Sequence, residues 1–80
     1  MRIDKYLKNS RIIKRRTLAK DACDQGRVLV NGRSAKPGTE VEQGDEILIM
    51  FGNGEMNVRV LSTPEHVTKD MAQSMYEIIQ

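Results

Sequence analysis

The stretch "LAKDACDQGRVLVNG" (residues 18–32) takes the chain from a helix into a hairpin. Its first half carries an apolar stripe at helical spacing, made of Leu18, Ala19, Ala22 and Cys23. That stripe predicts an amphipathic helix over about residues 15–25, and Gly26 stands where a left-handed residue ends a helix. The following "VLV" and Asn31-Gly32 form the pattern of a strand and a two-residue hairpin turn. The change of period at residue 27 favours an α+β fold.

Upstream of this stretch, the sequence predicts a second, shorter helix. Ile3, Tyr6 and Leu7 recur at helical spacing, which indicates an amphipathic helix over residues 2–9. Asn9-Ser10 ends it. The two predicted helices therefore lie next to each other in the chain, at its N-terminal end.

Downstream, the pattern is one of strands and tight turns. Pro37-Gly38 and Gly44-Asp45 are turn signals. The continuous apolar run "EILIMF" (46–51) predicts a central strand buried on both faces. "GNG" closes a further hairpin, and the alternating "EMNVRVL" (55–61) predicts a strand with one solvated face.

The last segment shows helical spacing again. Met71, Met75, Ile78 and Ile79 predict a C-terminal helix of about three turns, packed back on the sheet. The expected fold is α+β, with two N-terminal helices packed on a small antiparallel sheet plus this C-terminal helix. We expect residues 1–62 to form one domain and residues 63–80 a C-terminal helix on the same domain.

Positive charge is concentrated at the N-terminal end. Residues 1–20 hold eight Lys or Arg and one acid, Asp4, whereas residues 21–80 hold five basic and ten acidic residues. The formal net charge of +2 hides this polarity. A basic lobe on an otherwise acidic molecule favours a polyanionic partner, with nucleic acid as the first hypothesis.

The candidate binding residues all lie in that lobe. They are Arg2, Asp4, Lys5, Lys8, Arg11, Lys14, Arg15, Arg16 and Lys20. None of the three aromatic residues of the chain lies within the basic run 11–20, so a row of stacked bases is not expected. Recognition of structured RNA through phosphates and shape fits better, and Arg ranks above Lys for its planar fork of donors.

Asp4 has two interpretations, which the sequence leaves open. It is placed near a helix start, where a carboxylate is favourable, and four residues before Lys8, a common surface pair. Alternatively, Asp4 orients Arg16 or accepts a hydrogen bond from an RNA hydroxyl.

Nothing in the sequence indicates catalysis. One His and one Cys cannot supply a structural zinc site, and there is no HExxH motif, phosphate-binding glycine loop or nucleophile elbow. We expect no enzyme activity, no metal and no cofactor. Cys23 is expected to be a small buried residue and His66 a solvated one. The chain has no membrane-length apolar run and no signal-peptide pattern, so we expect a cytoplasmic protein without a membrane partner.

The stretch "SRIIKRRTLAKDACDQGRVLVNGRSAKPGTEVEQGDEI" (10–47) resembles the S-four RNA-binding domain, or alpha-L motif. The resemblance rests on the basic start of the second helix, Gly26, "VLVNG", Lys36-Pro37, Val41 and "GDEI". It implies that the two N-terminal helices, held against a small sheet, bind structured RNA. Many family members place a small hydroxyl residue where this chain has Arg15. A helix cap is thereby lost and a phosphate ligand gained.

The whole chain, from "MRIDKYLK" to "MYEII", is similar to the ribosome-associated quality-control P-site factors of Gram-positive bacteria. That resemblance implies binding to large ribosomal subunits obstructed by peptidyl-tRNA, with contacts to rRNA and tRNA. It also implies support for C-terminal alanine tailing of stalled chains, together with a tRNA-delivering factor. We expect the protein to be a monomer.

Two alternatives remain. A heat-shock S-four protein that recycles large subunits bearing nascent chains has the same fold and surface. A DNA-binding helix-turn-helix is less well supported, because the start of the second helix carries charge suited to phosphates and lacks Asn or Gln for base edges.

Overall fold

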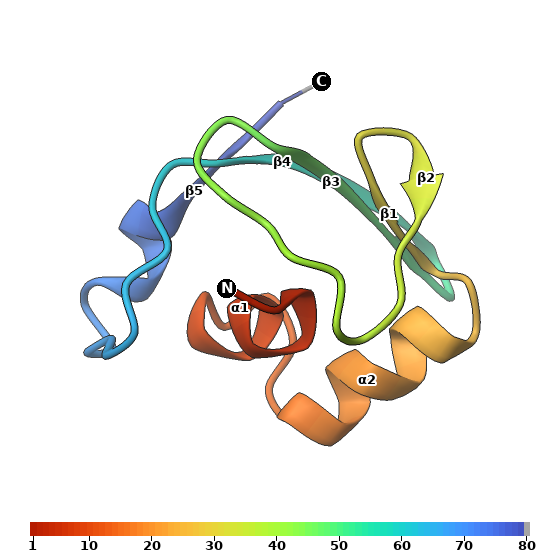
Figure 1. The fold of residues 1–80 in the computed structure, drawn as a ribbon, viewed down its shortest axis with the longest axis horizontal. Coiled ribbons are helices and arrows are strands. Elements are labelled where there is room, and N and C mark those ends of the chain that lie inside the picture. Colours follow the sequence, from red (N-terminus) through yellow and green to blue (C-terminus); the bar gives the residue numbers. More distant parts are fainter. Residues whose placement is uncertain (80) are drawn as a thin grey trace.

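In the computed structural model, which describes residues 1–79, two helices lie on one side of a curved five-stranded antiparallel sheet (Figure 1). The elements are α1 (Ile3–Asn9), α2 (Arg16–Asp24), β1 (Val28–Val30), β2 (Arg33–Ser34), β3 (Glu46–Phe51), β4 (Gly54–Val60), the 3-10 turn η1 (Ala72–Met75) and β5 (Tyr76–Ile78). The strand order is β2-β1-β3-β4-β5. The expected α+β fold with two N-terminal helices is confirmed.

Helix α2 ends as the sequence predicts. Gly26 has a φ of 75°, and its N–H donates to the Cys23 carbonyl at 3.0 Å. The N–H of Arg27 donates to the Ala22 carbonyl at 2.9 Å, which completes a Schellman motif. This cap turns the chain directly into β1.

The β1–β2 hairpin is also tied to β3. Asn31 and Gly32 both have positive φ, 52° and 83°, as a type I′ turn requires. The Asn31 side chain accepts from the Glu46 N–H at 3.0 Å and donates to the Asp45 carboxylate at 3.1 Å. The asparagine therefore shapes its own turn and fixes the register of the neighbouring strand.

The core lies between the helices and the inner face of the sheet. It is built by Ile3, Tyr6, Leu7, Ala19, Cys23, Val28, Ile47, Ile49, Val58, Val60 and Met75, with further residues around them.

The prediction that 46–51 is buried on both faces is wrong. The strand is central, but Ile47 and Ile49 are buried while Leu48 and Met50 are only half-buried. The reason is that helices cover only one face of the sheet. Leu18, counted in the apolar stripe of α2, is 51% exposed.

The predicted C-terminal helix is wrong. The segment makes one 3-10 turn, η1, and then joins the sheet as β5, antiparallel to β4. Met71 is exposed and Ile78 is 63% exposed, whereas Ala72 and Met75 are buried. The spacing of Met71, Met75 and Ile78 matched a helix, but of these three residues only Met75 is buried.

Tertiary hydrogen bonds explain why the helix does not continue. The Met75 carbonyl accepts from the Leu61 N–H at 2.7 Å and from the buried Tyr6 hydroxyl at 2.6 Å. In a helix it would accept from the N–H of Ile79, which instead donates to Asn57 at 2.9 Å. Strand β4 gains a hydrogen-bonded neighbour in this way. The predicted boundary at residue 62 stays a prediction, and Gln80 lies outside the described residues.

Candidate nucleic-acid interface

Asp4 lies in the basic lobe (residues 1–20) with only 2% of the residue exposed. Its two carboxylate oxygens accept hydrogen bonds from Arg2 Nε and Nη2 at 3.2 and 3.1 Å. Arg16 Nη2 donates to Oδ1 at 3.5 Å, and the backbone N–H of Lys5 donates to the same oxygen at 2.8 Å. One buried carboxylate therefore holds two guanidinium groups, which come from the starts of α1 and α2.

Both guanidinium groups remain accessible to a ligand. The side chains of Arg2 and Arg16 are each 49% exposed, and Asp4 uses only some of their five N–H donors. Together with Thr17 and Lys20 these residues line an open hollow. Three cations and one carboxylate leave the hollow positively charged. Two Arg forks fixed in place suit a phosphate group.

The backbone that carries Asp4 is held by the segment after β2. The N–H groups of Ile3 and Asp4 donate to the carbonyls of Thr39 and Pro37 at 2.7 and 3.3 Å. Helix α1 has no side-chain cap, so these carbonyls satisfy N–H groups that a helix start leaves free. The position of Asp4 therefore depends on the sheet as well as on α1.

The structure agrees with part of each interpretation of Asp4, because this residue lies in the first turn of α1 and also contacts Arg16. The contact with Arg16 agrees with the orienting role, and the closer contact with Arg2 was not predicted. Among the ion pairs of residues 1–79, none joins Asp4 to Lys8. Acceptance of a hydrogen bond from an RNA hydroxyl stays a prediction.

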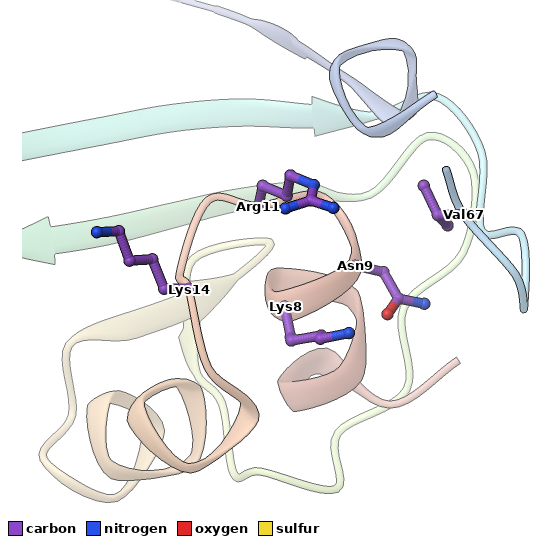
Figure 2. A pocket seen from close by; sticks show the side chains of 5 residues that line it. All are labelled: Lys8, Asn9, Arg11, Lys14 and Val67. Carbon is purple, nitrogen blue, oxygen red and sulfur yellow. The ribbon is translucent and has the colours of Figure 1, made fainter. Parts of the chain in front are cut away.

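The other predicted site residues do not gather at Asp4. Lys8, Arg11 and Lys14 line a second hollow, together with Asn9 and Val67 (Figure 2). Lys5 is ion-paired with Glu65, and this hydrogen bond lowers the pKa of the Glu65 carboxyl. The lobe is thus divided into two hollows that share no residue.

Arg15 precedes the first residue of α2 and is exposed. It has an extended backbone, with a φ of −129°, and makes no side-chain cap hydrogen bond. The loss of a capping side chain expected from the sequence is confirmed. A positive charge at this end opposes the helix dipole, and an anion bound there would offset that cost.

The buried Cys23 is not a reactive group. Burial raises the pKa of its thiol to about 11, and the nearby Asp4 and Asp24 charges add to the effect. The thiol therefore stays protonated near neutral pH. No group of acidic, His or Cys side chains within residues 1–79 could hold a metal ion. None of the helices in the described chain has the length and apolar character needed to cross a bilayer.

Comparison with known proteins agrees with this architecture. Residues 1–47 match the S4 domain family model. The chain is 53% identical over 78 residues to the RQC P-site tRNA stabilizing factor of Halalkalibacterium halodurans, covering 98% of this chain and 89% of that protein. It is 50% identical over 80 residues to the factor of the same name from Listeria monocytogenes, covering 100% and 87%.

A solved structure supports the same fold. The trimeric structure of Vibrio cholerae heat shock protein 15 superposes with a TM-score of 0.91 at 31% sequence identity, over 99% of this chain and 81% of that one. The chain belongs to the S4 domain family and, within it, to the family of RQC P-site tRNA stabilizing factors.

Proposed function

We propose that this protein binds large ribosomal subunits obstructed by peptidyl-tRNA, contacts both rRNA and tRNA, and supports C-terminal alanine tailing of stalled chains. It acts there as a binding factor and not as a catalyst. It is a monomer in the cytoplasm and works with a factor that delivers tRNA. The names of its relatives support the tRNA and ribosome parts of this proposal.

The observation that carries the proposal is the buried Asp4 carboxylate that holds Arg2 and Arg16. Orienting two half-exposed guanidinium groups before a ligand arrives reduces the entropy lost on binding. The arrangement suits phosphate oxygens, and Lys20 adds charge at the edge.

The aromatic residues favour phosphate contacts over base stacking. Tyr6 is buried and donates its hydroxyl to Met75. Phe51 ends β3, outside the basic lobe. Tyr76 begins β5 and is half-buried beside Ser10 and Arg11, so a single ring and not a row of rings borders the lobe. Recognition of structured RNA by backbone and shape follows from this distribution.

A second candidate function is recycling of large subunits by a heat-shock-type S4 protein. The superposition with heat shock protein 15 supports it, since a shared fold allows a shared binding surface. The higher identity to the P-site factors favours the first function. Alanine-tail synthesis in a cell extract depleted of the protein separates the two, because only the first function requires the protein for tailing.

The protein is expected to co-sediment with large subunits that carry tRNA more than with empty subunits or complete ribosomes. A small domain with cations on separate surfaces can lie between two RNAs and neutralise phosphates of both. The measurement is the bound fraction across a salt series, at salt high enough to suppress nonspecific binding. Equal binding to tRNA-bearing and empty subunits would contradict contact with two RNAs and leave rRNA binding intact.

Asp4→Asn tests whether the carboxylate positions the arginines. The change makes the molecule more positive, so charge alone predicts tighter RNA binding. We expect weaker binding instead, by about three- to tenfold, because the loss of Arg2 and Arg16 orientation, roughly 1 kcal/mol or more, outweighs the removal of one negative charge. Affinity for tRNA-bearing subunits measures the effect, and Asp21→Asn on the exposed surface of α2 is the control. Tighter binding by Asp4→Asn would refute positioning.

A further inference from the structure

We propose that Lys8, Asn9 and Arg11 form a second anion site, separate from the Asp4 hollow, that takes one phosphate group of the bound RNA. This inference rests on the proposed RNA-binding function and deepens it. The site lies at the C-terminal end of α1 and the start of the following turn, whereas Asp4 lies in the first turn of that helix. The segment between β4 and η1 closes one side through Val67.

The first observation is the backbone of Arg11. Its φ is 61°, in the left-handed region that side chains disfavour and glycine adopts readily. Arg11 follows the end of α1, and its N–H donates to the Lys8 carbonyl at 3.0 Å, as the residue after a helix cap does. Glycine would adopt this backbone conformation at a lower energetic cost. A guanidinium kept there at a cost to the backbone points to a ligand for it.

The second observation is the Asn9 side chain. Its Nδ2 atom is buried and has no hydrogen-bond partner among residues 1–79, in contrast to the buried Asp4 and Ser10 side chains. A buried donor without an acceptor is unfavourable. A turn of the Asn9 amide towards the hollow would let an oxygen of a bound anion satisfy it. Asn9 lines the same hollow as Arg11, so the orphaned donor and the strained cation lie at one place.

The charge and size of the hollow agree with an oxyanion. Within residues 1–79, none of the ion pairs uses Lys8, Arg11 or Lys14, and none of the residues lining this hollow is acidic. Its volume of about 120 Å³ has room for a phosphate group. In Figure 2, Lys8 and Arg11 extend towards the side of Asn9 and Val67, whereas Lys14 extends the other way.

A neighbouring hollow is a weaker candidate for the anion. Arg11 also borders it, together with Lys69, Asp70 and Gln73. There the Asp70 carboxylate opposes an incoming phosphate. The hollow that contains Asn9 therefore takes the anion. Arg11 borders both hollows and contributes its positive charge to this one.

Arg11→Gly separates binding from folding. Glycine removes the cation and relieves the left-handed strain, so we expect an unchanged or raised Tm together with a three- to tenfold loss of affinity for tRNA-bearing large subunits. The log–log salt slope should become shallower by roughly 0.7 to 1, the contribution of one phosphate contact. Arg11→Gln tests the charge alone, with the side chain kept, and should lose affinity to the same extent. Arg33→Gln, on exposed β2, is the charge-matched control and should bind as the parent does.

Arg16→Glu, measured in parallel, separates failure of the second anion site from failure of the proposed RNA binding. Full affinity of Arg11→Gln, with binding lost in Arg16→Glu, would overturn the second site and leave RNA binding standing. Full affinity in both variants would overturn the proposed function itself. As a direct check, the Asn9 side-chain amide signals of ¹⁵N-labelled protein should shift on addition of a short RNA hairpin. Shifts confined to Arg2, Arg16 and Lys20 would also refute the second site.

Discussion

Arg16→Glu is expected to weaken binding to tRNA-bearing large subunits by about 100-fold or more, equivalent to about 2.7 kcal/mol, and to abolish alanine tailing. The change removes a charge-assisted donor and puts a negative charge where we expect a phosphate. Co-sedimentation and tail synthesis on stalled chains measure the two effects.

Folding should survive this substitution. The Arg16 side chain is 49% exposed, and the buried Asp4 carboxylate keeps its closer partner, Arg2 at 3.1 Å, when the 3.5 Å contact with Arg16 is lost. A glutamate in the first turn of α2 also interacts favourably with the helix dipole. We therefore expect a Tm within a few degrees of the parent. Arg33→Glu, with the same net charge but outside the lobe, is the control. Equal loss of binding in that control would mean that net charge, and not the Asp4 cluster, governs affinity.

Met75→Ala is expected to lower the free energy of unfolding by about 2–5 kcal/mol. Met75 is fully buried between α1 and the sheet, and its carbonyl accepts from Tyr6 and Leu61. Truncation leaves a cavity at the point where the C-terminal segment is fastened to the core. For a domain of this size, that loss corresponds to a fall in Tm of at least about 8 °C in a thermal melt.

Met71→Ala is the matched control, since the same side chain is lost from an exposed position of the same segment. We expect a change within about 0.5 kcal/mol. A three-turn amphipathic helix would bury both methionines and predict similar losses. Equal destabilisation by the two variants would therefore contradict the arrangement of η1 and β5.

Local sequence determined the parts of the fold whose signals are complete within a few residues. Gly26 supplies the left-handed cap of α2, and Asn31-Gly32 supplies the type I′ turn. The apolar stripe of Ile3, Tyr6 and Leu7 determined which face of α1 is buried. In each case the backbone conformation follows from the residue itself or from a period of the nearby chain.

The structure of the C-terminal segment does not follow from its local sequence. Met71, Met75 and Ile78 have helical spacing, but a short apolar pattern is compatible with more than one structure. The result depended on partners that are distant in sequence. Strand β4 has a free edge that, among the described strands, only β5 pairs with, and Tyr6 and Leu61 both donate to the Met75 carbonyl. The same limit applies to β3, because its sequence does not say that helices cover only one face of the sheet.

For the candidate site, the sequence by itself determined which residues carry the charge and that they lie within residues 1–20. Only the tertiary structure decided which of these residues lie close together in space. Packing of α1 against α2 brings Arg16 to Asp4 across twelve residues of sequence, and the segment after β2 holds the Asp4 backbone in place. Arg2 joins them, although sequence alone gave no partner for it. The physical reason is that charge is a property of each residue. The pairing of the Arg2 and Arg16 guanidinium groups, in contrast, exists only where two helix starts meet at one buried carboxylate.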